Sequence, residues 1–126
     1  MRQVEQDIVQ AARFGVSFHS GTSSSYKPYA TGYRDNLTFD KNTFSYKLWG
    51  SEIAKGNTDS KEITVSDCGY RTHTTASRLN ALFAALDIPM TVMFRQGYTY
   101  WCKDGEIYTT SSFSFIHAGE YDVTIV

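Results

Sequence analysis

Residues 74–89 read Thr-Thr-Ala-Ser-Arg-Leu-Asn-Ala-Leu-Phe-Ala-Ala-Leu-Asp-Ile-Pro. Apolar side chains recur in this stretch at intervals of three and four residues, which places them along one side of a helix. They are Leu79, Leu82, Phe83 and Leu86. Thr74 or Thr75 supplies a hydroxyl for the N-cap, and Pro89 ends the segment because proline cannot continue a helix. The stretch therefore predicts a helix with one buried face.

The chain before this helix contains a second helical pattern and several strands. Residues 4–12 carry apolar side chains at helical spacing, and Gly15 ends that segment. From residue 37 the apolar period changes to two, and residues 37–48 alternate around a turn at residues 40–42, which predicts a hairpin. A polar loop is expected at residues 56–60, followed by a short strand.

The chain after the helix is rich in strand patterns. The run from residue 98 to 108 contains Asp104-Gly105 between alternating segments, a strong hairpin signal because both turn residues need positive φ. Residues 113–115 and 121–125 also alternate. We therefore expect an α+β fold in which residues 1–126 form a single domain, with an antiparallel sheet and two helices packed on one face.

Residues 20–35 are expected to form a mobile loop, because their serine, glycine and proline residues cannot build a core. Tyr26, Tyr29 and Tyr33 are spaced along this stretch. Tyrosine offers contact area at low entropic cost, which favours a partner-binding surface. The alternative is that the tyrosines lay the loop down on the sheet.

Composition and charge argue against several classes of protein. The hydrophobic fraction of 41% is too high for a chain that is disordered throughout. The formal net charge of −1 provides neither the basic excess of a non-specific nucleic-acid binder nor the acidic surface of a DNA mimic. The chain has two cysteines, no signal-peptide pattern and no apolar stretch long enough to span a bilayer. We expect a cytoplasmic protein with reduced thiols and no membrane partner.

Catalytic and metal-binding motifs are absent from the sequence. No histidine pairs with another histidine or a cysteine at ligand spacing, so no metal and no cofactor are predicted. A nucleophile could be built from Cys102 with His117, or from Cys68 with His73, of which Cys68 is the better candidate because Arg71 lies nearby. A free cysteine is more commonly a small buried apolar residue. We therefore expect no catalytic residue and no enzyme.

Two arginines flank the expected start of the helix at residues 74–89. The exposed amides of a helix N-terminus favour anions, and Arg71 and Arg78 would add positive charge there. A carboxylate or phosphate of a partner could dock at this point. The alternative is that the threonines only cap the helix and the arginines are solvated.

Four segments between Phe44 and Phe83 carry a resemblance to known proteins. They read Phe-Ser-Tyr at 44–46, Trp-Gly-Ser-Glu-Ile-Ala at 49–54, Ile-Thr-Val at 63–65 and Thr-His-Thr-Thr-Ala-Ser-Arg-Leu-Asn-Ala-Leu at 72–82. This stretch resembles small accessory proteins encoded by bacteriophages. The resemblance implies a role among inhibitors of host defence, anti-CRISPR proteins included, which block a host complex sterically. It implies no catalytic residues.

The resemblance and the residues together lead to one expectation of function. The protein is expected to bind and inhibit a bacterial host protein or ribonucleoprotein complex, a CRISPR-Cas effector among them. The partner-binding residues are predicted to be Tyr26, Tyr29, Tyr33, Arg71 and Arg78. The alternative is a module that binds single-stranded nucleic acid through an aromatic sheet face carrying Tyr98, Tyr100 and Tyr108.

Overall fold

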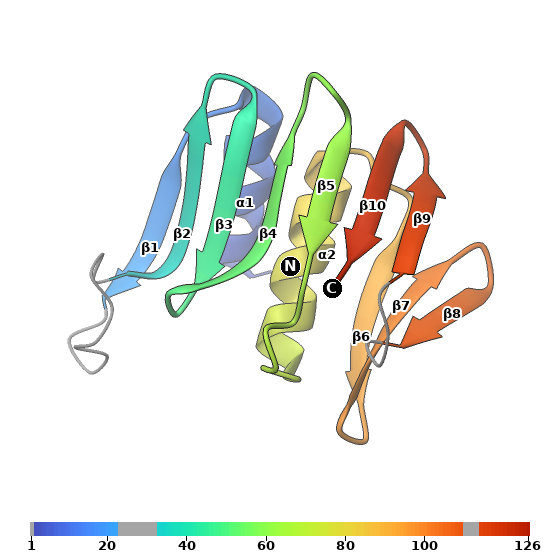
Figure 1. Cartoon of the computed structure of the whole chain (residues 1–126). Coiled ribbons are helices and arrows are strands. Elements are labelled where there is room, and N and C mark those ends of the chain that lie inside the picture. Colours follow the sequence, from blue (N-terminus) through green and yellow to red (C-terminus); the bar gives the residue numbers. More distant parts are fainter. Residues whose placement is uncertain (1, 23–32, 110–113) are drawn as a thin grey trace.

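Two helices and ten strands make up the described part of the chain, which comprises residues 2–22, 33–109 and 114–126 of this computed structural model (Figure 1). In chain order they are α1 (Gln3–Phe14), β1 (Phe18–Thr22), β2 (Tyr33–Asp40), β3 (Thr43–Leu48), β4 (Ser51–Asn57), β5 (Glu62–Val65), α2 (His73–Ala85), β6 (Thr91–Arg95), β7 (Tyr98–Lys103), β8 (Glu106–Thr109), β9 (Ser114–Ala118) and β10 (Tyr121–Ile125). The α+β class and both predicted helices are confirmed.

The strands form two sheets, so the prediction of one antiparallel sheet is confirmed only in part. The large sheet has the order β1-β2-β3-β4-β5-β10-β9, and β6-β7-β8 form a separate small sheet. Neighbours in the large sheet are antiparallel except β5 and β10, which run parallel with Ile63 opposite Val123. A parallel pair needs a long crossover. Here the chain between β5 and β10 includes α2, the whole small sheet and β9.

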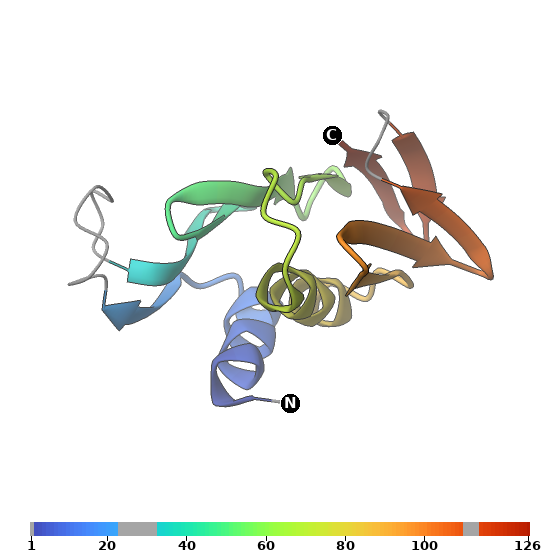
Figure 2. The same ribbon diagram turned by 90° about the horizontal axis from the view of Figure 1, so that it is seen from below.

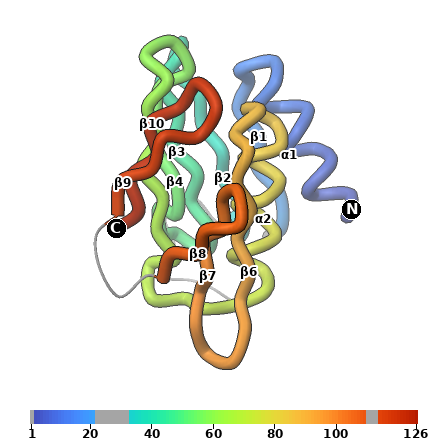
Figure 3. Tube along the Cα trace, turned by 90° about the vertical axis from the view of Figure 1, so that its right-hand side faces the viewer, coloured from blue at the N-terminus to red at the C-terminus, as the bar shows by residue number. Residues whose placement is uncertain are grey.

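The helices do not simply cover a single sheet. Helix α2 packs against α1 on one side and against strand β6 on the other, with a smaller contact to β4. Seen from below, the two helices lie side by side under the large sheet, and the small sheet stands next to α2 (Figure 2). The view from the small-sheet side shows β6, β7 and β8 as a compact unit (Figure 3).

The predicted end of the first helix and the predicted Asp104-Gly105 turn are confirmed, whereas the N-cap of α2 differs from the prediction. Helix α1 ends at Gly15, whose φ of 65° is the left-handed conformation that glycine adopts without penalty. Both residues of the hairpin turn at Asp104-Gly105 have positive φ, 51° for Asp104 and 81° for Gly105. The N-cap of α2 is Thr72 rather than Thr74 or Thr75, and its hydroxyl accepts a hydrogen bond from the Thr75 amide at 3.2 Å.

The predicted loop at residues 20–35 is wrong at both of its ends. Residues 20–22 belong to β1 and residues 33–35 to β2, and the two strands pair antiparallel with Phe18 opposite Leu37. Strand β1 is an edge strand, where hydrogen bonds to one neighbour hold even small polar residues in an extended conformation. Residues 23–32 of that prediction lie outside the described residues.

One hydrophobic core joins the helices and both sheets. It includes Ile8 of α1, Leu82 of α2, Val123 of β10 and Trp101 of β7, each fully buried. The small sheet therefore contributes one of its faces to the core that it shares with the large sheet. Its other face is free of that core, and this arrangement positions the candidate site. Among the described residues, no helix has the length and apolar character that crossing a membrane requires.

Candidate functional site

The small sheet turns a row of large side chains toward solvent. Alternation along the strands and the register, with Met93 opposite Tyr100 and Cys102 opposite Ile107, place these side chains on one face. We call this the small-sheet face, and it consists of Met93, Arg95, Tyr98, Tyr100, Cys102 and Ile107. The exposed fractions are 48% for Met93, 56% for Tyr98 and 64% for Ile107. Neighbouring exposed apolar side chains of this size mark an interaction surface more often than scattered ones do.

An arginine lies at one end of the small-sheet face. The Arg71 guanidinium is 6.0 Å from the centre of the Tyr98 ring, and the two tyrosine rings of Tyr98 and Tyr100 are 6.4 Å apart. Arg71 also forms a long ion pair with Asp67 at 3.9 Å, and its side chain is 47% exposed. The buried Asp67 carboxylate is fixed by the Thr99 hydroxyl at 2.9 Å. Arg71 is therefore tethered beside the tyrosines without being buried, as suits a cationic contact at the rim of an interface.

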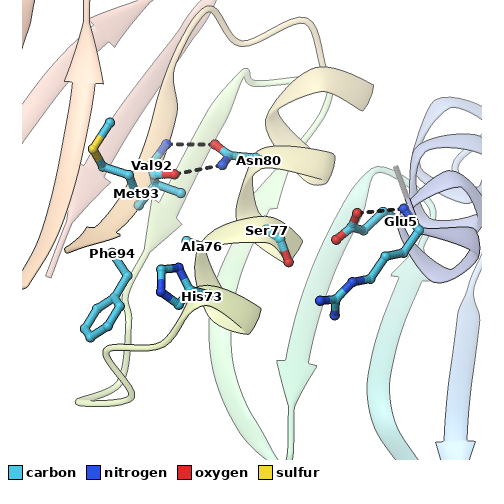
Figure 4. Close-up of a pocket in the computed structure, with 9 residues that line it drawn as sticks. Glu5, His73, Ala76, Ser77, Asn80, Val92, Met93 and Phe94 are labelled. Carbon is cyan, nitrogen blue, oxygen red and sulfur yellow. Dashed lines mark hydrogen bonds between the residues drawn. The ribbon is translucent and has the colours of Figure 1, made fainter. Parts of the chain in front are cut away.

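A groove runs along the other border of the small sheet, between β6 and α2 (Figure 4). Its volume is about 820 Å³, and Met93 lines it as well as belonging to the small-sheet face. The Asn80 side chain crosses from α2 to β6. Its amide donates to the Val92 carbonyl and accepts from the Val92 N–H, both at 2.7 Å. Asn80 thus anchors the edge of the small sheet to α2 in the way that a neighbouring strand would.

Arg78, predicted as a partner-binding residue, is instead part of a buried polar network. Its side chain is 2% exposed and binds Asp35 at 2.8 Å and Glu5 at 3.4 Å. Asp35 also accepts from the Tyr46 hydroxyl at 2.6 Å and from Arg34 at 2.7 Å. Burial, together with the negative charge of Asp35, raises the pKa of the Tyr46 phenol far above its ordinary value. Arg78 is unavailable to a partner because it is buried in ion pairs with Glu5 of α1 and Asp35 of β2.

Tyr33, another predicted site residue, lies away from the small sheet. Tyr33 begins β2, where its ring stacks on His19 with centroids 4.5 Å apart, and it is 37% exposed. Its strand lies near the β1 edge of the large sheet, at the opposite end of the strand order from β9. Tyr26 and Tyr29 lie outside the described residues. Of the predicted residues that the structure describes, only Arg71 lies beside the small-sheet face.

The aromatic face expected for a nucleic-acid module is formed only in part. Tyr98 and Tyr100 share the exposed face, but Tyr108 is opposite Trp101 and belongs to the other face, packed against the core. The reason is the two-residue period of strands, because a one-residue change in position moves a side chain to the opposite face. Met93 and Ile107 complete the face and were not singled out by the sequence. Strand alternation could have grouped them, but it does not tell which face is exposed.

The cysteine candidate for catalysis shows no pairing with histidine among the described residues. The Cys68 thiol donates to the Glu52 carbonyl at 3.0 Å, and burial raises its pKa. The His73 ring packs edge-on against Phe94, with centroids 5.1 Å apart. No group of three or more metal-ligating side chains occurs in the part of the chain that the structure describes.

The fold and site define a small mixed α+β protein with an aromatic, apolar sheet face open to solvent. Residues 1–121 match the family described as Kyanoviridae Gp96 protein. The chain therefore belongs to this family and is a phage protein. No curated protein and no solved structure matches the chain.

Proposed function

We propose that this phage protein is a non-enzymatic inhibitor that binds a bacterial host factor through the small-sheet face. It acts in the cytoplasm of the infected cell, and a CRISPR-Cas effector is among the candidate factors. The observation that carries the proposal is the grouping of Met93, Tyr98 and Ile107 on one exposed face, each about half or more accessible to solvent. Aromatic and aliphatic side chains that become buried at the centre of an interface supply most of its binding energy.

The aliphatic part of the face favours a protein partner. The flexible Met93 side chain can adapt to an irregular surface. Transfer of the Ile107 side chain from water to an apolar pocket would contribute favourable free energy to binding. Neither side chain stacks on nucleotide bases. Arg71 beside Tyr98 supplies a charged contact at the border, where a polar rim usually surrounds the apolar centre of an interface.

The experiment that tests this function is a pull-down with the tagged protein from bacterial lysate treated with nuclease. A double variant, Tyr98→Ser with Ile107→Ser, removes the two most exposed of the large apolar side chains on the face. The control is Phe115→Ser on β9, because Phe115 is 61% exposed and lies outside the small sheet. We expect a stoichiometric host complex with the wild type and the control, and its loss with the double variant. If the double variant retains the complex, the small-sheet face is not the binding surface. If the wild type captures no host complex, the proposed function is wrong.

Binding of single-stranded nucleic acid is the second candidate, and a specific observation favours it. Tyr98 and Tyr100 lie near each other on the face, with Arg71 over Tyr98 and Arg95 opposite it in the register. Tyrosines with nearby arginines can stack bases and contact phosphates. Titration of fluorescent single strands at increasing salt tests this function. Affinity that falls steeply with salt and is lost on Tyr98→Ser would support it, whereas no binding at low salt would remove it.

A further inference from the structure

The border of β6 toward α2 leaves one backbone position open. In an antiparallel pair, successive residues point their N–H and C=O groups alternately toward and away from the partner strand. Val92 directs both groups away from β7, since Asn80 binds them. Phe94 lies two residues further along the same strand, so its N–H and C=O also point away from β7. In the described residues these two groups have no hydrogen-bond partner, and Phe94 lines the groove.

Asn80 shows what kind of group this edge accepts. Its side-chain amide presents one donor and one acceptor, as a peptide unit does, and both bonds to Val92 are short at 2.7 Å (Figure 4). A peptide backbone lying beyond Asn80 would meet Phe94 with the same donor and acceptor pattern. Adding a strand to an open sheet edge is a recurrent mode of peptide recognition. The volume of about 820 Å³ leaves room for a short extended segment.

The charge of the groove identifies the chemistry of that segment. Arg2 lines the groove with an exposed side chain and forms no ion pair within the described residues, so its guanidinium can bind a carboxylate. Glu5 is the only carboxylate among the described residues that line the groove, and it is already engaged by Arg78 and by the Arg2 backbone N–H at 3.1 Å. A carboxylate on the incoming segment would therefore complement Arg2. A neutral or basic segment would leave the arginine uncompensated.

We propose that the groove between α2 and β6 binds an extended acidic peptide segment, which pairs with the backbone of Phe94 and places a carboxylate on Arg2. This rests on the proposed function, because it names the part of the host protein that docks here. Met93 lines both the groove and the small-sheet face, so one partner segment at the β6 edge would extend the sheet and remain in contact with that face.

The probe that tests the proposal is a library of random ten-residue peptides displayed on filamentous phage and selected on the full chain. The library should yield peptides rich in β-forming residues and carrying Asp or Glu. A synthetic copy of one selected peptide should perturb the backbone amide resonances of Phe94 and the Asn80 side chain in ¹⁵N spectra. Arg2→Glu should weaken its binding roughly tenfold or more, since it replaces a charge-assisted contact with repulsion.

Three further variants separate the backbone contact from the charge. Phe94→Pro removes the outward N–H without removing a hydrogen bond to β7, so it should weaken peptide binding. The control is Phe94→Val, which keeps the N–H and should bind the peptide more tightly than Phe94→Pro. Lys55→Glu is the matched charge reversal on the exposed part of β4, and it should leave binding unchanged. Arg2→Glu keeps the test decisive if Phe94→Pro does not fold.

Three results would overturn the proposal. They are a library that yields no binder, a selection without acidic residues, and a binder that is insensitive to Arg2→Glu. The host pull-down distinguishes this failure from failure of the proposed function. A host complex that survives Arg2→Glu but is lost with the small-sheet double variant would refute groove docking and leave the inhibitor function standing. Capture of nucleic acid in place of protein would reject both.

Discussion

Replacing Arg78 by methionine tests the finding that this residue is structural and not a partner contact. Arg78 is 2% exposed and pairs with Asp35 at 2.8 Å and Glu5 at 3.4 Å. Removing one partner of a buried ion pair costs about 3–5 kcal/mol, because the other charge remains buried without compensation. Asp35 would keep its bonds to Arg34 and Tyr46. We therefore expect a loss near the lower end, about 3 kcal/mol of unfolding free energy.

Urea unfolding followed by tryptophan fluorescence measures this loss. With a slope of about 1–3 kcal/mol per molar urea, the midpoint should fall by roughly 1–3 M. The control is Arg71→Met, because Arg71 is half-exposed and its ion pair is long at 3.9 Å. That variant should lose less than about 1 kcal/mol. An Arg78→Met protein within about 1 kcal/mol of the wild type would show that the buried network contributes little to stability.

Three further outcomes follow from the geometry. Gly56→Ala should destabilise the protein by about 1–3 kcal/mol in the same urea assay, because a Cβ there would lie 2.3 Å from the Glu62 carbonyl oxygen and 2.9 Å from the Phe44 ring. Unchanged stability would show that β4 and β5 can separate. The raised pKa of Tyr46 keeps its phenol protonated in the folded protein, whereas the phenol ionises in the unfolded chain. The free energy of unfolding should therefore fall as pH rises above about 10, and it should fall less steeply in Tyr46→Phe. Equal slopes of unfolding free energy against pH in the two proteins would contradict a raised pKa for Tyr46. Burial raises the pKa of the Cys68 thiol, so iodoacetamide should alkylate Cys68 at neutral pH more slowly in the folded protein than in the urea-unfolded chain. Peptide mass mapping measures the two rates. Rapid alkylation in the folded state would restore the cysteine nucleophile as a candidate.

The elements that the sequence predicted correctly are those determined by local chemistry. The apolar spacing of α2 and the Asp104-Gly105 turn depend on residues that are near one another in the chain. The pairing of β5 with β10 depends on segments far apart, and no local pattern specifies it. Gly56 illustrates the same limit. The sequence predicts a polar loop there, but Gly56 lies inside β4, where the Glu62 carbonyl of β5 leaves no space for a side chain.

The candidate site shows where sequence reasoning fails and why. Arg78 lies four residues before Leu82, on the buried side of α2, and Asp35 lies two residues before Leu37, on the buried side of β2. These spacings are a signal for a buried ion pair that the prediction of a solvent-facing anchor overlooked. The exposure of Met93 and Ile107 carries no such signal. It follows from the small sheet using its other face for the core, which only the tertiary arrangement determines.

Site-specific photocrosslinking tests whether the small-sheet face contacts a host protein. A photoreactive phenylalanine analogue replaces Tyr100 in the middle of that face, and in a separate protein it replaces Phe115 on β9. Both proteins are expressed in bacteria, irradiated and analysed after nuclease treatment. We expect one discrete crosslinked host protein from position 100 and none from position 115. Crosslinks to nucleic acid, equal products from both positions, or no product from position 100 would contradict it.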